Sequence, residues 1–427
     1  MANYNSRRSF LKSAAGASAL FTLTPAVPDF LLHTAAAAES TAGSSDQNGS
    51  QRHNDRVLVV IELAGGNDGL NTVIPYADDI YHKNRFATRI NDKAVLKLDD
   101  YVGFHPAMTG VRKLFEQEKV AVMQGVGYPN PERSHFFSMD IWHTAHRDVK
   151  QMRRMSGWVG RYLDAQQGKL GNDLPAIHLG AERQPLAVVG QKVRVPSVSS
   201  FESFKLHVGK DERIAKIIGA AAQAKRLTSK DDDLLNYLQK STVAALDSSR
   251  QVQRAARGYK TDVKYPTTAA ARKLKSVAQL MDAGMTTKVY YITLGGFDTH
   301  ANQTVGHSTL LKEFSDGVSA FLADLKQHGH EDRVLLMTFS EFGRRLKENA
   351  SRGTDHGSAG PMFLMGNHLK SGLIGKHPSL KDLDKVGDIR FHTDFRQVYA
   401  DILQNWLKVD SKQVLGGSFE ATRVISV

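Results

Sequence analysis

Short runs of apolar residues, rich in valine, isoleucine and leucine, recur along this chain and alternate with segments of a different period. The runs long enough for a buried strand span residues 57–63, 120–123, 288–294, 334–339 and 361–365. Because consecutive positions in each run are apolar, both faces of the strand are expected to be covered. This is typical of strands inside a parallel sheet.

Helical periodicity marks several of the intervening segments. Apolar residues spaced three and four apart occupy residues 314–325 and 395–406, which predicts a helix in each. Strands that alternate with helices in this way predict an α/β fold, with a mostly parallel sheet between helical layers. In such sheets, ligands bind at the loops that follow the carboxyl ends of the strands.

Polar residues gather in four glycine-rich loops at the ends of these strands. Residues 62–72, 295–303 and 340–345 each leave a strand, and residues 353–360 precede the last one. Their candidate metal ligands are Asp68, Asp298, His300, Glu341, Asp355 and His356. Singly, each of these residues is more typical of a turn. Together they predict a site for a divalent ion such as Zn, Mn, Mg, Fe or Ca, which take carboxylate and imidazole ligands.

A serine at the start of another predicted helix is a candidate nucleophile. Residues 130–132 form a predicted turn, and Ser134 follows where its side chain can cap the helix. The residues of this helix predicted to face inward are Phe137, Ile141, Thr144 and Ala145. Ser134 has two interpretations: a cap alone, or a hydroxyl made nucleophilic by the helix terminus and a metal. Arg133 and His135 beside it would complement a phosphate or sulfate.

The first 38 residues have the pattern of an export signal. Arg7 and Arg8 are followed by Phe-Leu-Lys, as in twin-arginine signals, and an apolar stretch ends in the alanines of 36–38. Prolines and a glycine interrupt that stretch, which favours a cleavable signal peptide over a membrane span. We expect export by the twin-arginine translocase to the periplasm or the medium, with no membrane span after cleavage. Residues 39–54 are rich in glycine and serine and predict a flexible linker.

Composition narrows the chemistry. The 427 residues include no cysteine, which excludes disulfides, thiolate nucleophiles and cysteine-ligated zinc or iron–sulfur sites. Histidine and carboxylate side chains remain as strong metal ligands. Neither a zinc-finger spacing nor an aromatic-basic sheet motif is present, so nucleic acid is not an expected partner.

Positive charge is concentrated in the middle of the chain. The formal net charge is +12, and residues 205–280 hold 16 lysines and arginines against 7 acidic residues. This part has helical spacing, and we expect a helical insertion over about 205–285. It is either a solvated helical face or a basic cap that attracts an anionic substrate, glycan or membrane surface.

Several motifs in combination resemble one protein family. They are GGNDGLNT at 65–72, RSHF at 133–136, GFDTHANQ at 296–303, SEFGR at 340–344, GTDHG at 353–357 and FHTDFRQVYADIL at 391–403. With the twin-arginine signal, they resemble the domain of unknown function family 1501, exported bacterial proteins placed with the alkaline phosphatase and sulfatase superfamily. The likeness runs from about Val57 to the C-terminus.

The resemblance implies a three-layer α/β/α sandwich with a two-metal site that hydrolyses phosphate or sulfate esters. Carried over by position, Ser134 would be the nucleophile and Asp68 the ligand after the first strand. The residues of one metal site would be Asp298, His300 and His356, and those toward the second would be Glu341 and Asp355. Arg344 or Arg133 would neutralise the ester oxygens, and His392 would lie in the outer shell unless it is a surface residue.

Two departures from the superfamily pattern affect the second metal. Asp298 and His300 are separated by one residue instead of three or more, and Glu341 stands where an Asp-His pair normally ends a strand. Either a loop insertion has displaced the pair to Asp355 and His356, or Glu341 has replaced it and His356 serves the other metal. We favour the second interpretation, because residues 361–365 have the pattern of the strand that follows the last metal histidine. The second site is then short of one imidazole, so a single-metal protein is an alternative.

These observations predict an exported, metal-dependent hydrolase of phosphate or sulfate esters that acts on an anionic small molecule or a glycan ester. The competing hypothesis is a non-catalytic exported scaffold of the same fold. A scaffold of this kind would use the basic insertion to bind an envelope partner.

Overall fold

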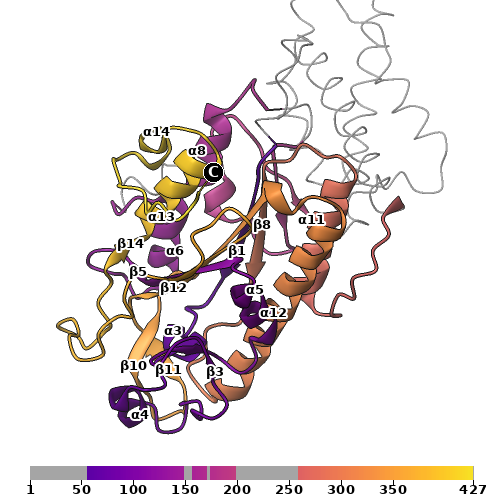
Figure 1. Cartoon of the computed structure of the whole chain (residues 1–427). Helices are drawn as coiled ribbons and strands as arrows, with labels where there is room; N and C mark the ends of the chain where they lie inside the picture. The colour runs from indigo at the N-terminus through magenta and orange to yellow at the C-terminus, as the bar shows by residue number, and fades with distance from the viewer. Residues whose placement is uncertain (1–54, 149–155, 171–173, 199–257, 427) are drawn as a thin grey trace, which may run out of the picture.

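The computed structural model describes residues 55–148, 156–170, 174–198 and 258–426. Figure 1 shows their arrangement. The predicted signal peptide, the predicted linker and most of the predicted basic insertion lie outside the described residues.

A central sheet carries all five predicted strands. Its strands are β1 (Val57–Leu63), β5 (Val120–Gly127), β6 (Ala176–Leu179), β7 (Ser197–Val198), β8 (Val289–Leu294), β9 (Val334–Phe339), β12 (Gly360–Met365), β13 (Gly372–Ile374) and β14 (Thr393–Asp394). Among the described residues their order is β13-β5-β12-β9-β1-β8-β6-β7, with β14 also paired to β5. Every pairing is parallel except those of β12 with β5 and β9. The expected mostly parallel sheet is confirmed.

Helices cover both faces of the sheet. One layer holds α5 (Thr109–Glu116), α11 (Ala269–Asp282) and α12 (Gln303–Gln327); the other holds α6 (His135–Thr144), α8 (Trp158–Ala165), α13 (Phe395–Asp401), a π-helical turn η7 (Ile402–Trp406) and α14 (Ser411–Leu415). The predicted helices over 314–325 and 395–406 therefore fall within α12 and within α13 plus η7.

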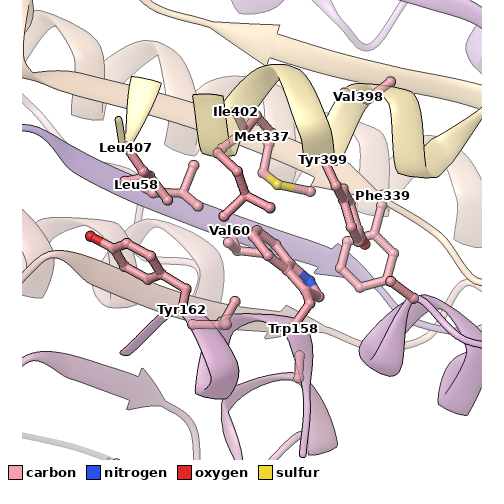
Figure 2. Close-up of a cluster of buried hydrophobic side chains, with 14 of the residues drawn as sticks. Leu58, Val60, Trp158, Tyr162, Met337, Phe339, Val398, Tyr399, Ile402 and Leu407 are labelled. Atoms are coloured by element: carbon pink, nitrogen blue, oxygen red, sulfur yellow. The ribbon is translucent and has the colours of Figure 1, made fainter. Parts of the chain in front are cut away.

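Side chains of β1 alternate between the two layers. Val59 and Ile61 pack in the core under α11 and α12, whereas Leu58 and Val60 pack in the core under α8 and α13. Figure 2 shows the second core, in which the rings of Trp158 and Tyr399 stack with centroids 4.4 Å apart. Such a pair contributes about 0.5–1.5 kcal/mol beyond the area that it buries. The three-layer sandwich is thus built from two separate cores.

The end of the predicted insertion belongs to the sandwich. Helix α11 lies inside the range 205–285, yet its Leu274, Val277 and Met281 are buried in the first core. The insertion prediction therefore does not hold for α11, because an alanine-rich and lysine-rich segment still presents one apolar stripe to the sheet.

The reversed direction of β12 brings the predicted loops together. The carboxyl ends of β1, β8 and β9 share one edge of the sheet, and the first residue of antiparallel β12 lies at the same edge. A two-stranded hairpin, β10 (Arg344–Glu348) and β11 (Thr354–His356), connects β9 to β12 there.

The remaining described elements are short and pack outside the main sheet. They are α3 (Gly69–Thr72), α4 (Asp79–Asn84), the small sheet of β2 (Val73–Ile74), β3 (Leu96–Lys97) and β4 (Gly103–Phe104), and the 3-10 turns η3 (Leu186–Val188) and η6 (Glu331–Arg333). None of the described helices combines the length and the apolar character needed to cross a bilayer.

Candidate metal centre

Three imidazoles converge on one carboxylate at this edge. His135 is the first residue of α6, Asp298 and His300 follow β8, and His356 ends β11. The Nε2 atoms of His300 and His356 lie 3.1 and 3.2 Å from Oδ1 of Asp298, and Nε2 of His135 lies 3.4 Å from its Oδ2. Ligand atoms of His135, Asp298 and His356 all lie within 4.8 Å of one another.

Each ring is held by its other nitrogen. Nδ1 of His135 is 2.8 Å from Glu341, Nδ1 of His356 is 2.7 Å from the carbonyl of Arg133, and Nδ1 of His300 is 3.2 Å from Asp355. An ionised carboxylate and a carbonyl can only accept, so these contacts place a proton on each Nδ1. In the neutral rings, Nε2 then carries the lone pair that a metal requires.

The Nε2 atoms themselves fit a cation. Nε2 of His135 is buried and, within the described part of the chain, has no hydrogen-bond partner. Nε2 of His300 lies 2.8 Å from Nε2 of His356, and two lone pairs repel at that distance unless a proton or a cation lies between them. The two imidazole nitrogens and the carboxylate that lie within 4.8 Å of one another, those of His135, His356 and Asp298, suit Zn²⁺ and also Mn²⁺ or Fe²⁺. Nε2 of His300 lies beside this group, bonded to Asp298 and His356.

Protonation states favour the same interpretation. Burial raises the pKa of Asp298, but the Arg344 guanidinium and His356 outweigh it and lower that pKa to about 2. Burial lowers the pKa of His356, which keeps this ring neutral at pH 7. The hydrogen bond to Glu341 raises the pKa of His135. A metal ion bound here would therefore compete with a proton more at His135 than at His356.

Glu341 positions His135 and the loop after β1. Its buried carboxylate accepts from the amide of Gly65, at 2.9 and 3.1 Å from its two oxygens, as well as from His135. Gly65 has a φ of +120°, and a Cβ there would lie 2.4 Å from the amide nitrogen of Asp298. Only glycine allows the loop after β1 to approach the loop after β8 this closely.

Arg344 and Arg133, the arginines predicted to neutralise the ester oxygens, bind protein groups in this structure. Arg344 is buried and donates to Asp298 at 2.7 Å, and to the carbonyls of Gly66, Thr354, Phe297 and Gly65. Its charge therefore acts on Asp298 and fixes the surrounding loops. The side chain of Arg133 pairs with Asp388 at 2.6 Å and Asp384 at 3.3 Å.

The structure does not bring Asp68 to this cluster. Its carboxylate is fully buried, with Arg85 nitrogens at 2.5 and 3.1 Å and the Gln303 amide nitrogen at 2.5 Å. Asp355 is only partly buried. Its carboxylate is hydrogen-bonded to Nδ1 of His300 and, at 3.0 Å, to the side-chain amide of Asn349. The described residues contain no second group of three histidine or acidic side chains with this spacing. The described residues thus supply one group of side chains with metal-binding spacing.

Ser134 occupies the N-cap position of α6, as predicted, but its side chain makes no capping hydrogen bond. Among the described residues its hydroxyl has no hydrogen-bond partner. Phe137 is 38% exposed, contrary to the inward orientation predicted for it, whereas the other three residues of that set are buried. His392 is exposed and lies 2.7 Å from the carbonyl of Lys376, apart from the metal cluster.

An open cleft of about 980 Å³ lies beside the cluster. His135, Asp298 and Glu341 form part of its wall. The cleft is also lined by apolar residues, among them Phe136, Met139 and Leu186, and by polar residues, among them Glu62, His143 and Glu182. Phe136 is 83% exposed. The candidate metal centre is therefore accessible to a molecule larger than water.

Sequence reasoning missed two groups of residues here. Glu62 and His143 were not proposed for the site, although Glu62 is the one charged residue in the apolar run of 57–63 and could have been noticed for that reason. Arg85 and Gln303, which hold Asp68, gave no comparable signal.

Comparisons with known proteins identify relatives of this chain. A family model described as "Protein of unknown function (DUF1501)" matches residues 55–417. None of the curated proteins matches the chain in sequence.

Three solved structures illustrate the structural similarity. The lipoteichoic acid synthase LtaP from Listeria monocytogenes is 9% identical over 90% of this chain and 80% of its own, with a TM-score of 0.39. The PsFucS1 sulfatase from Pseudoalteromonas sp. is 11% identical over 85% and 68%, with a TM-score of 0.40. A protein in the alkaline phosphatase superfamily from Vibrio parahaemolyticus is 9% identical over 91% and 77%, with a TM-score of 0.37. At these values, neither activity nor site residues are transferred from them to this chain.

Proposed function

Because the chain belongs to the family described as protein of unknown function (DUF1501), whose description names no activity, we propose its function from the site: a metal-dependent hydrolase of phosphate or sulfate esters. One observation carries the proposal. Three imidazoles, each with Nδ1 bonded to an acceptor, direct Nε2 toward the Asp298 carboxylate beside an open cleft. A buried structural metal has no need of such a cleft, whereas a catalytic metal requires access.

The metal ligands that we propose are His135, Asp298, His300 and His356. A divalent cation held there would supply positive charge to the non-bridging oxygens of an ester. Glu341 orients His135, and Arg344 keeps Asp298 ionised and in place. Three acidic residues are left out of the ligand set: Asp68 pairs with Arg85 away from the cluster, Glu341 holds Nδ1 of His135, and Asp355 holds Nδ1 of His300.

We propose Ser134 as the nucleophile. It precedes the ligand His135, and the start of α6 places backbone N–H groups and a positive dipole end around it, which suits an anionic group. Its oxygen would form a seryl ester as the alcohol departs, and water would then hydrolyse that ester. The substrate class is an anionic small molecule or a glycan ester.

Export belongs to the same proposal. We infer that residues 1–38 direct the protein through the twin-arginine translocase to the periplasm or the medium. The support comes from the order of twin arginines, apolar stretch and alanines.

The test combines metal content with turnover. Protein purified without chelator is analysed by mass spectrometry and assayed with phosphate and sulfate esters, before and after chelation, together with His356→Ala and, as a control, His392→Ala. We expect about one metal per chain, metal-dependent hydrolysis, loss of both in His356→Ala, and retention in His392→Ala. A protein that neither holds nor takes up Zn, Mn or Mg would overturn the hydrolase and leave the non-catalytic scaffold.

A further inference from the structure

The cleft beside the candidate metal centre follows one face of α6. Phe136, Met139, Asp140 and His143 line it. Because these positions recur three and four residues apart, they form one stripe along the helix. Residues 182–186, before and at the start of η3, line the cleft as well. The cleft is therefore elongated, with α6 along its length.

The two ends of this cleft lie far apart. His135 at the metal centre and His143 in the last turn of α6 are eight residues apart, which corresponds to about 12 Å along the helix axis. Beside His143 lie Glu62 at the end of β1 and Tyr291 in β8. These three residues are too distant from Ser134 to take part in breaking the ester bond. They can contact only another part of a bound molecule.

This distal end holds a polar cluster whose hydrogen bonds are incomplete. Oε2 of Glu62 accepts from the hydroxyl of Tyr291 and, at 2.9 Å, from Nε2 of His143. Burial and the adjacent carboxylate raise the pKa of Tyr291 well above its usual value, so its hydroxyl keeps its proton. Glu62 and His143 are only 4% and 5% exposed and both line the cleft. Among the described residues, Oε1 of Glu62 and Nδ1 of His143 have no hydrogen-bond partner.

The two unpaired atoms indicate what the distal end binds. Folded proteins pair nearly all their buried polar atoms, with protein groups, with water or with a ligand. A hydroxyl both donates and accepts, so two neighbouring hydroxyls satisfy Oε1 of Glu62 and Nδ1 of His143 whether or not that nitrogen carries a proton. An ammonium only donates and fails when Nδ1 is protonated. Hydroxyl groups therefore fit the pair best.

An exposed aromatic ring lies between the two ends. Phe136 follows His135, lines the cleft and is 83% exposed. Ligand pockets combine aromatic surfaces with a few placed polar groups. A sugar ring has a face of C–H groups that packs against an aromatic ring and an edge of hydroxyls that form hydrogen bonds. From the metal outward, the cleft thus offers positive charge, an aromatic ring and a hydrogen-bonding pair.

We propose that the cleft binds the alcohol part of the ester as a glycan of at least two sugar units, with neighbouring hydroxyls on Glu62 and His143. The inference rests on the proposed hydrolase function and narrows its substrate class to glycan esters. The separation of about 12 Å exceeds the length of a single sugar ring. Tyr291 holds the Glu62 carboxylate in place for this contact.

Esters that differ only in the alcohol test the proposal. We would measure kcat/KM of the metal-loaded protein for one acid, phosphoric or sulfuric, esterified to 4-nitrophenol or to a terminal primary hydroxyl of glucose, maltose or cellobiose. An 8-aminooctyl ester of similar reach presents an ammonium instead of hydroxyls. A hydrogen bond to a charged group contributes about 10- to 100-fold. We expect a disaccharide ester to exceed the glucose ester by about 10-fold or more, and the aminooctyl ester to show no such gain.

Variants at the distal end give a second readout. His143→Gln keeps an N–H for Glu62 but has no atom at the place of Nδ1. The ratio of kcat/KM between a disaccharide ester and the 4-nitrophenyl ester should fall about 10-fold in this variant. Glu62→Gln, which replaces a charged acceptor with a neutral one, should lower the ratio in the same direction. The surface control His392→Gln should keep the wild-type ratio. A misfolded or metal-poor variant would lose both esters equally.

The outcomes separate this inference from the proposed function. Equal rates for glucose and disaccharide esters, a preference for the ammonium, or an unchanged ratio in His143→Gln would each overturn the glycan site and leave the hydrolase. If wild type hydrolyses none of the esters, the proposed function fails, and calorimetric titration with free maltose and cellobiose decides the cleft alone. Binding that His143→Gln weakens would retain a sugar site on a non-catalytic protein, whereas no binding would overturn it.

Discussion

Glu341 and His135, which lie 206 residues apart in the sequence, share a hydrogen bond of 2.8 Å between Oε1 and Nδ1. Because Glu341 also accepts from the amide of Gly65, its carboxylate joins three loops of the sheet edge at the base of the proposed metal centre. The bond fixes the tautomer of His135 and directs Nε2 toward Asp298.

Replacing Glu341 with glutamine should weaken metal binding without abolishing it. The amide oxygen can still accept from His135, but the negative charge that increases the basicity of the ring is lost. Loss of such an outer carboxylate costs about 10- to 100-fold in metal affinity. Competition with a chromophoric chelator measures this, with Glu331→Gln, remote and paired with Lys119, as the control. Unchanged affinity would show that Glu341 does not tune the ligand.

Asp68 is predicted to stabilise the fold without holding metal. Removing one partner of its buried pair with Arg85 leaves an uncompensated charge, which costs about 3–5 kcal/mol. Asp68→Asn should lower the free energy of unfolding by an amount of this order and leave the metal content per folded chain unchanged. Loss of metal from folded Asp68→Asn would restore Asp68 as a ligand.

The same carboxylate makes stability depend on pH. Burial raises the pKa of Asp68, but the charge and hydrogen bond of Arg85, with Gln303, lower it overall below its ordinary 3.8. A depressed folded pKa gives stability that is present above 3.8 and lost as pH falls through the folded value. The free energy of unfolding of wild type, measured with denaturant, should therefore decrease as the pH falls below about 4. Asp68→Asn should show a shallower slope; an identical slope would exclude this carboxylate as the source.

Gly65 is predicted to tolerate no side chain. An alanine there would combine a φ of +120° with a Cβ 2.4 Å from the backbone of Asp298, so the ligand loop must shift. A displacement of about 1 Å is enough to reduce function by about 100-fold. We expect Gly65→Ala to bind metal weakly. Gly168→Ala, with a φ of +81° and open space around it, carries the strain without the clash and should bind metal normally.

Export is predicted to depend on the arginine pair. Changing both Arg7 and Arg8 to lysine keeps the charge but removes the guanidinium groups, and the protein should accumulate in the cytoplasm. Cell fractionation with immunoblotting measures the distribution, and Arg52→Lys in the linker is the matched control. Normal export of the twin-lysine variant would exclude the twin-arginine route.

The residues that meet at the sheet edge were largely predictable from the sequence, because the direction of the strands alone brings their loops together there. Asp298, His300 and His356 were expected at one metal and do lie together, since their loops leave or enter neighbouring strands. His135 was expected to complement a bound phosphate or sulfate, whereas the structure places its ring against the carboxylate of Asp298. That role depends on Glu341, a contact between segments far apart in the chain.

Asp68 shows why the remainder was not predictable from the loop pattern. An aspartate in a glycine-rich loop has the same local signature whether it binds a metal or an arginine. The deciding residue, Arg85, lies in a polar stretch that gives no sign of burial, and only packing against the β10 hairpin encloses it. Similarly, His143 acquires its partners only when α6 packs across β1 and β8.

The position of β1 has a consequence for how the chain is made. Both of its neighbours, β8 and β9, are encoded more than 220 residues later. During synthesis the first strand therefore emerges with two open edges and stays unpaired until most of the chain has been translated. Long-range pairing of this kind slows folding and exposes apolar edges to aggregation. A truncated chain that ends before residue 289 would lack the centre of its own sheet.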